Sequence, residues 1–154
     1  MDLGDLIVPE GVIPSLKAKS KKQVLQGLAR KAAELAGIDE NLAFEALFRR
    51  EQLASTGYGY GIAIPHARLP GLKRVMSVFA RLDEPLPFDA VDDEPVDLVF
   101  LLLAPEHAGA DHLKALARIS RLLRDHQSIV KLRSCHGRDA LHAVLTEPLA
   151  THAA

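Results

Sequence analysis

The segment Val96–Leu103 is apolar at every position except Asp97, and this feature constrains the fold more than any other. A strand with one face in water alternates polar and apolar residues, whereas a nearly continuous apolar run is typical of a strand covered on both faces. The run is far too short to cross a membrane, which takes about 20 apolar residues. The sequence therefore predicts a central strand in a sheet with helices on both faces, and no membrane insertion.

The spacing of apolar residues predicts five helices around this sheet. Ser20 and Gln23 have the spacing of a capping box at a helix start, and Gly37 is suited to end that helix in the left-handed conformation. Asp39 is suited to cap a second helix. The predicted helices span residues 20–37, 39 to about 50 or 53, 109 or 111 to 123, 127–133 and 138–146. The third is expected to bury one face, made of Leu113, Leu116, Ala117, Ser120 and Leu123.

Four strands are predicted, over residues 12–16, 62–64, 75–82 and 96–103. Pro14 places the first at an edge of the sheet, and Pro65 ends the second because proline has no N–H to donate. Loops are predicted at residues 55–61, 83–95 and 104–110. Helices alternating with strands indicate a single α/β domain over residues 1–154, with an ordered core over about residues 6–146 and a frayed tail from Pro148.

Charge and cysteine content narrow the function. The net charge is −1 and no long basic run occurs, so nothing indicates nucleic-acid binding. Cys135 is the only cysteine, which excludes an internal disulfide, and no signal peptide is recognisable. We therefore expect a cytoplasmic protein of one domain, a size that 154 residues suits.

The strongest local signal for chemistry is the segment Gly61–His66, which places a histidine just past a short strand. We expect this side chain to point into the mouth of the domain, because pairing has stopped at Pro65. An imidazole with an ordinary pKa of about 6.5 is largely the neutral nucleophile at cytoplasmic pH. Its attack on a phosphoryl group gives a phosphoramidate, which transfers onward. On position alone, a surface or hydrogen-bonded histidine is the alternative interpretation.

Two more residues have properties that suit a phosphoryl group. His112 falls in the first turn of a predicted helix, where a neutral ring could donate a hydrogen bond to a phosphoryl oxygen. Arg50 ends the second helix, and a guanidinium can bind two oxygens through parallel hydrogen bonds. The alternatives are a simple helix-start residue for His112 and a solvated arginine pair, with Arg49, for Arg50. Ser55 and Thr56 could add hydroxyl groups.

Nucleotide binding is not indicated. Gly57, Gly59 and Gly61 alternate and precede a strand, whereas a dinucleotide fingerprint or a Walker loop opens a helix with a different spacing. We expect no cofactor.

The sequence does not indicate metal or thiol chemistry either. His107, Asp111 and His112 match no standard ligand spacing, so we expect no metal. Cys135 and His136 are neighbours in sequence, and neighbours rarely face each other on a helix. The other histidines are expected at the surface: His107, His126, His136, His142 and His152.

Three segments together resemble a known family. Residues 50–57 (REQLASTG), 61–66 (GIAIPH) and 112–117 (HLKALA) resemble the IIA proteins of the bacterial phosphotransferase system. The class is the mannitol–fructose type, which includes the nitrogen-regulatory IIA proteins. The resemblance covers about residues 6–145, and it favours the chemical interpretation of the histidine over the surface one.

The resemblance implies a mixed sheet flanked by helices on both sides. It implies that His66 is the phosphorylation site and that His112 and Arg50 lie beside it and stabilise the phosphoryl group. It also implies that the loop with Ser55, Thr56 and Gly57 frames the pocket. The activity implied is a phosphotransferase relay from a phosphohistidine carrier protein, without a metal or a nucleotide.

The sequence departs from the family pattern at four positions. Ala67 and Arg68 stand where the family often has glycine and lysine, and Tyr58 and Tyr60 are bulky for their loop. We expect these residues to affect the rim of the pocket, and so the choice of partner.

The branch of the family is a further expectation. The chain stands without an attached IIB or carrier domain, which favours the regulatory type, whose phosphorylation state controls other proteins such as a kinase or an ion-transport protein. The alternatives are a free-standing sugar IIA, which passes the phosphoryl group to a IIB protein, and a non-catalytic protein-binding module.

Overall fold

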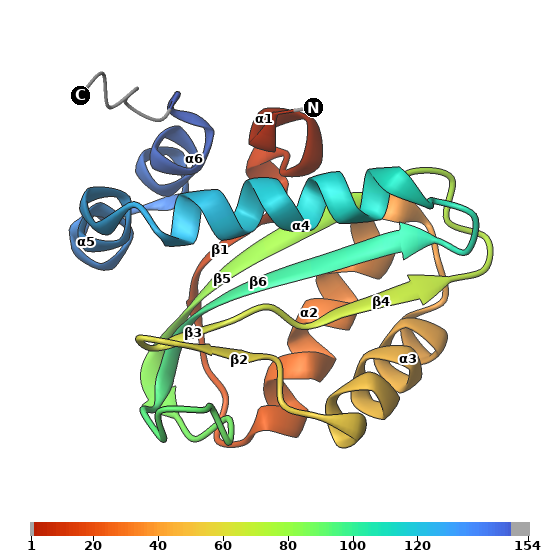
Figure 1. The fold of residues 1–154 in the computed structure, drawn as a ribbon, viewed down its shortest axis with the longest axis horizontal. Helices are drawn as coiled ribbons and strands as arrows, with labels where there is room; N and C mark the ends of the chain where they lie inside the picture. The colour runs from red at the N-terminus through yellow and green to blue at the C-terminus, as the bar shows by residue number, and fades with distance from the viewer. Residues whose placement is uncertain (1, 149–154) are drawn as a thin grey trace.

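A computed structural model describes residues 2–148, which form a mixed six-stranded sheet between two layers of helices (Figure 1). The elements are α1 (Leu3–Leu6), a 3-10 helix (Pro9–Gly11), β1 (Val12–Leu16), α2 (Lys21–Ala36), α3 (Glu40–Leu53), β2 (Gly57–Gly59), β3 (Ile62–Ala63), β4 (His66–Leu69), β5 (Met76–Leu86), β6 (Val96–Pro105), α4 (Ala110–Leu123), α5 (His126–Ser134) and α6 (Arg138–Thr146). None of the helices within residues 2–148 is both long enough and apolar enough to cross a membrane. The predicted fold class is confirmed.

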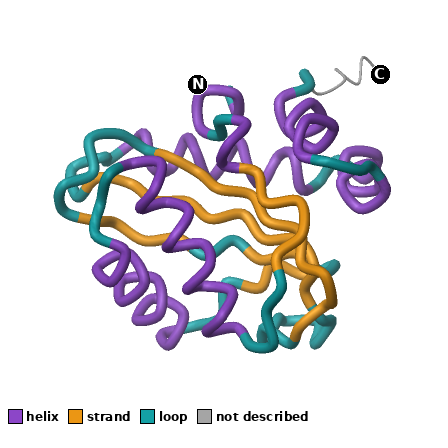
Figure 2. The backbone as a smooth tube through the Cα atoms, turned by 180° about the vertical axis from the view of Figure 1, so that it is seen from behind, coloured by secondary structure: helices purple, strands orange, loops and turns teal. Residues whose placement is uncertain are grey.

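Strand β6 has a separate hydrophobic core on each of its faces. Phe100 and Leu102 pack in the core shared with α4, α5 and α6 (Figure 1). Val99 and Leu101 pack in the core beneath α2 and α3, the helices that cover the sheet when it is seen from behind (Figure 2). All four side chains are fully buried. Because alternate residues of a strand face opposite sides, these two cores explain why the run is apolar at nearly every position.

The strands lie in the order β1-β5-β6-β3-β2, with β4 also paired to β6. Strand β5 runs antiparallel to β6, while β3 and β4 both run parallel to it. Strands β3 and β4 therefore lie one after the other along β6, separated by Ile64 and Pro65. As predicted, β1 is at an edge of the sheet, where it pairs in parallel with β5.

The predicted helix ends are confirmed by their hydrogen bonds. The hydroxyl of Ser20 accepts from the backbone N–H of Gln23 at 3.2 Å, and the carboxylate of Asp39 accepts from Leu42 at 3.0 Å. Gly37 ends α2 with a φ of 68°, in the left-handed region that glycine adopts without steric cost. These short-range signals are why the first two helices could be placed from sequence.

All three predicted loops contain strand, because β6 also continues to Pro105, within the predicted loop 104–110. Residues 83–95 were expected to be a loop, but β5 continues to Leu86, which pairs with Val96, and Phe88 and Ala90 are buried. The acidic and proline residues at 83–85 are exposed, so their composition indicated contact with water rather than a break in pairing. Within the predicted loop 55–61, residues Gly57–Gly59 form β2 against β3.

The predicted buried face of α4 is only partly correct, because Leu123 is buried and Leu116 packs against the core, but the rest of the buried face differs. Leu113 is 66% exposed, whereas His112, Ala115 and Ile119 are buried. The buried stripe is rotated by one position, and it begins with a histidine that apolar periodicity does not count. This rotation turns His112 toward the sheet.

Candidate functional site

His66 is the first residue of β4, and its side chain is half-buried. Its Nδ1 lies 2.8 Å from the carbonyl oxygen of Ile64. A carbonyl oxygen can only accept a hydrogen bond, so Nδ1 carries the proton of the neutral ring and Nε2 keeps its lone pair. The hydrogen bond therefore leaves Nε2 as the nucleophilic nitrogen.

The backbone at His66 is held on both sides of a short gap in pairing. Pairing was expected to end at Pro65, but it resumes at once, because His66 pairs with Leu102 of β6. Within the gap, the N–H of Ile64 donates to the carbonyl of Thr56 at 3.0 Å, and the N–H of Leu102 donates to the carbonyl of Pro65 at 2.9 Å. The histidine thus projects from a fixed strand rather than from a loop.

Strand β4 sends alternate side chains to opposite faces of the sheet. Ala67 packs against the core beneath α2 and α3, so His66 and Arg68 face the other side, toward α4. Of the two departures from the family pattern that follow the histidine, only Arg68 lies on the histidine's side. Ala67 is only partly buried and packs against that core, so its effect on the rim of the pocket stays a prediction.

His112 lies in the first turn of α4, and its side chain faces His66. It is only 6% exposed. The centroids of the two rings are 6.0 Å apart, and the ring planes are nearly perpendicular at 89°. The Nδ1 atom of His112 is buried and has no hydrogen-bond partner within residues 2–148. Because buried polar atoms are nearly always paired, this atom is suited to bind a group that arrives at the site.

Burial lowers the pKa of His112 below its usual value, and the positive charge of Arg68, together with that of His66 whenever its ring is protonated, lowers the pKa further. Because the ordinary value is about 6.5, a ring with a lowered pKa is mostly neutral at pH 7. A neutral ring can donate one hydrogen bond and adds no positive charge beside an unphosphorylated His66.

Arg68→Ala is expected to raise the pKa of His112 part of the way toward its usual value, because burial, the larger cause, is unchanged. Histidine titration followed by NMR measures this shift. Unfolding adds a second check. Unfolded His112 binds a proton first as the pH falls below about 6.5, so the free energy of unfolding of the unsubstituted protein should decline below that pH. Arg118→Ala, which removes an exposed cation from α4, is the control, and an equal shift in both variants would contradict the role of Arg68.

Arg50 lies in the last turn of α3, a helix that packs against β4. Its Nη1 donates a hydrogen bond to the carbonyl of Ala54 at 2.8 Å, which holds the guanidinium at the start of the segment that leads to β2. The other N–H groups of Arg50 donate to no residue of the described chain, 2–148. Arg49 is exposed. The structure therefore separates the environments of the two neighbouring arginines.

The residues expected to frame the pocket hold their own loop in place. The hydroxyl of Ser55 donates to the carbonyl of Phe88 at 2.5 Å and accepts from the N–H of Gly57 at 3.0 Å. The hydroxyl of Thr56 donates to the buried carboxylate of Glu51 at 2.6 Å. Gly57 has no room for a Cβ, which would lie 2.7 Å from a side chain of the loop after β5. Their direct contact with a phosphoryl group stays a prediction.

The other histidines have varied surroundings. His107, His126 and His136 are exposed as expected. His142 is half-buried, and its Nε2 lies 3.0 Å from the carbonyl oxygen of Ile7, so it connects α6 to the N-terminal segment instead of lying free at the surface. His152 is outside the described residues. Across residues 2–148, no group of three or more histidine, cysteine or acidic side chains is arranged to hold a metal ion.

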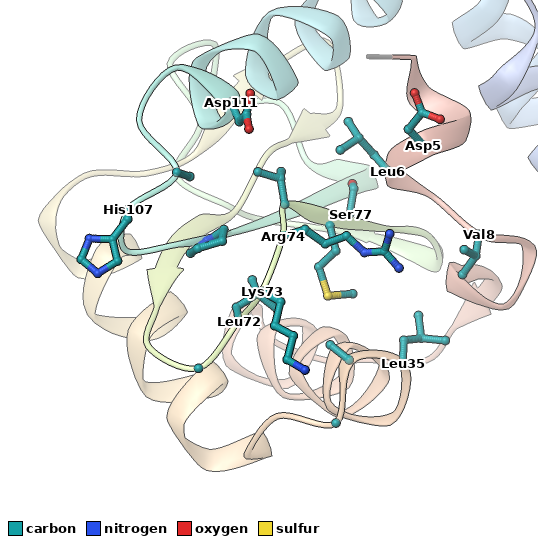
Figure 3. Close-up of a pocket in the computed structure, with 17 residues that line it drawn as sticks. Asp5, Leu6, Val8, Leu35, Leu72, Lys73, Arg74, Ser77, His107 and Asp111 are labelled. Atoms are coloured by element: carbon teal, nitrogen blue, oxygen red, sulfur yellow. The ribbon is translucent and has the colours of Figure 1, made fainter.

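A cleft of about 1160 Å³ opens elsewhere, between α1, the end of α2, the turn after β4 and the loop before α4 (Figure 3). Its lining combines Lys73 and Arg74 with Asp5 and Asp111. This mixture of charges favours neither an anionic nor a cationic ligand. The cleft includes none of the three residues expected to carry the chemistry.

Comparison with known proteins gives consistent matches. Residues 5–147 match the family model described as "Phosphoenolpyruvate-dependent sugar phosphotransferase system, EIIA 2". A "Nitrogen regulatory protein" of Bradyrhizobium diazoefficiens is 57% identical over 99% of this chain and 100% of its own. Another of that name, from Pseudomonas aeruginosa, is 40% identical over 94% and 95%. A "PTS system fructose-specific EIIA component" of Haloferax volcanii is 36% identical over 83% and 84%.

Solved structures share the fold. Nitrogen regulatory protein IIA-Ntr of Neisseria meningitidis superposes with a TM-score of 0.88, at 33% identity, over 94% of this chain and 99% of its own. IIA mannitol of Escherichia coli gives a TM-score of 0.77 at 20% identity, over 90% and 98%, a likeness that concerns the fold alone.

Proposed function

Because the chain belongs to the phosphoenolpyruvate-dependent sugar phosphotransferase system EIIA 2 family, we propose that it accepts a phosphoryl group on Nε2 of His66 from a phosphohistidine carrier protein. Membership of this family supports a phosphocarrier role. The observation that carries the choice of atom is the contact between Nδ1 of His66 and the carbonyl of Ile64, which leaves Nε2 unprotonated.

The transfer exchanges one phosphorus–nitrogen bond for another. The bond in the donor breaks, and its electron pair returns to the donor ring. The lone pair of Nε2 forms the new bond, while Nδ1 of His66 keeps its proton and its hydrogen bond. A loose, in-line transition state spreads charge over three phosphoryl oxygens. The contribution of the protein is then to position the nucleophile and to stabilise that charge.

We assign three side chains to the stabilisation of the negative charge on the phosphoryl oxygens. The buried Nδ1 of His112 would donate a hydrogen bond to a phosphoryl oxygen, because the neutral ring can place its proton there. Arg50 would bind oxygens through the N–H groups that Ala54 does not occupy. Arg68, which faces the same side as His66, would attract the phosphoryl group without needing a direct contact.

Arg50→Ala is expected to slow phosphoryl uptake roughly 10- to 100-fold, because a charge-assisted hydrogen bond contributes roughly 1.5–3 kcal/mol. Arg50→Lys should keep part of the activity, since lysine supplies the charge but not the two-pronged geometry. The measurement is the rate of uptake from the phosphorylated carrier, with circular dichroism to confirm folding.

Arg49→Ala is the matched control. The residue is exposed and lies about 100° around the helix axis from its neighbour, so its rate should stay near that of the unsubstituted protein. A slow Arg49→Ala beside a normal Arg50→Ala would show that the assignment is wrong by one residue.

The regulatory branch is the favoured biological role. The relatives named nitrogen regulatory protein include one at 57% identity across nearly the whole chain. In this role the phosphorylation state of His66 would control a partner such as a kinase or an ion-transport protein. The relative named for fructose favours a second candidate, a sugar IIA that passes the phosphoryl group to a IIB protein.

Capture from a native lysate distinguishes these roles. Phosphorylated protein and His66→Ala would be used as baits, and the captured proteins identified. A IIB protein that takes phosphate from the bait indicates sugar transport, and a kinase or transport protein bound by one form only indicates regulation. Partners that bind both baits equally would favour a protein-binding module without phosphoryl transfer.

A further inference from the structure

We propose that Glu51 is a positioning residue for the phosphoryl acceptor. Its buried carboxylate fixes, through Thr56, the backbone of Ile64, whose carbonyl keeps the proton of His66 on Nδ1. The proposal deepens the function proposed above and rests on it, but the state of the His66 ring can be measured without any phosphoryl transfer.

Glu51 is an acidic residue inside the protein, with an exposed fraction of 6%. Acidic side chains are almost never this buried unless they are paired. Both carboxylate oxygens accept from the N–H of Thr56, at 3.0 and 3.1 Å, and one also accepts from its hydroxyl at 2.6 Å. The carboxylate therefore binds the backbone and the side chain of the same residue, which fixes the position of Thr56 in the loop after α3.

Thr56 transmits this position to the gap between β3 and β4. Its carbonyl accepts the N–H of Ile64 at 3.0 Å, at the point where Ile64 has left the ladder with β6. The carbonyl of Ile64 in turn lies 2.8 Å from Nδ1 of His66. Three consecutive contacts thus connect the carboxylate of Glu51 to the nitrogen whose protonation decides which ring atom is the nucleophile.

The cation that balances Glu51 occupies an unusual place. Lys21 is the first residue of α2, where the helix dipole disfavours positive charge. Its Nζ lies 3.1 Å from Glu51 and 3.4 Å from Asp89, and 5.1 Å from the centre of the Phe88 ring. Lys21 therefore links the carboxylate of Glu51 to the loop after β5, which contains Phe88 and Asp89. The backbone carbonyl of Phe88 in turn accepts the hydroxyl of Ser55, in the loop after α3.

The test compares Glu51→Gln with the unsubstituted protein. An amide keeps the size of the side chain but has one acceptor oxygen in place of two, and it loses the charge. The measurement is the nitrogen NMR shifts of the neutral His66 ring, which report the share of molecules with the proton on Nδ1. We expect that share to fall and the rate of phosphoryl uptake to drop roughly 10- to 100-fold, as expected for a small displacement of a reacting group.

Two other variants complete the design. Thr56→Val removes only the hydroxyl donor and keeps the backbone bonds, so it should shift His66 in the same direction by a smaller amount, and it decides the question if Glu51→Gln does not fold. Glu45→Gln removes an exposed carboxylate from the same helix and should change neither reading. The proposal is overturned if folded Glu51→Gln, or Thr56→Val in its place, keeps the His66 protonation of the unsubstituted protein.

The two readings separate this proposal from the function itself. A ring that responds to Glu51→Gln in a protein that takes up no phosphate would support the positioning role and contradict the phosphocarrier role. If the His66 ring does not respond to Glu51→Gln in a protein that is phosphorylated normally, the result would support the phosphocarrier role and contradict the positioning role.

Discussion

His66→Ala is expected to abolish phosphoryl acceptance, because the variant lacks the nitrogen that would form the new bond. The assay incubates the protein with phosphoenolpyruvate, the first enzyme of the system and the phosphohistidine carrier, and then measures bound phosphate. The unsubstituted protein should take up one phosphoryl group, and acid should release it, as is typical of a phosphoramidate.

The fold of this variant should survive, since the side chain is only half-buried and its pairing with Leu102 uses the backbone. His107→Ala, which removes an exposed histidine from the loop before α4, is the control and should be labelled fully. Undiminished labelling of His66→Ala would place the acceptor on another residue.

His112→Ala is expected to slow transfer roughly 10²–10³-fold, the loss that follows removal of one preorganised donor to developing charge. The physical reason is the position of the ring, which is buried, neutral and 6.0 Å from His66 between ring centroids. The measurement is the single-turnover rate of uptake from the phosphorylated carrier, with the melting temperature recorded for the same sample.

A pair of substitutions identifies the donating atom. Asparagine at position 112 places an amide near the Nδ1 site and glutamine places one near the Nε2 site, so His112→Asn should recover more activity than His112→Gln. Equal rates for His112→Ala and the unsubstituted protein would reduce His112 to a buried helix-start residue.

The central strand and the first helix caps could be predicted because their causes are local. Nearly continuous apolar character defines β6, and Ser20 and Asp39 each bind a backbone group three residues away. The continuation of β5 to Leu86 was missed because its pairing with Val96 of β6 leaves no mark in the exposed acidic residues that precede it.

The candidate site could be named but not built from sequence. His66, His112 and Arg50 come from three separate segments, and only the family resemblance brought them together. The role of Glu51 was missed because an acidic residue in a helix is ordinarily assumed to be exposed, and the lysine paired with it, Lys21, lies on another helix. The nitrogen of His66 that carries the proton is set by a hydrogen bond to a backbone carbonyl. Every residue has such a carbonyl, so no residue type in the sequence indicates this contact.

Because β3 and β4 pair one after the other along β6, hydrogen exchange at one backbone amide in the gap between them can report on the site. The N–H of Leu102 donates to Pro65 within the gap, and the residue is fully buried. An amide exchanges its hydrogen with solvent only when its hydrogen bond opens. The exchange rate of this single amide therefore records how often the backbone beside His66 separates from β6, in a protein whose sequence has not been altered.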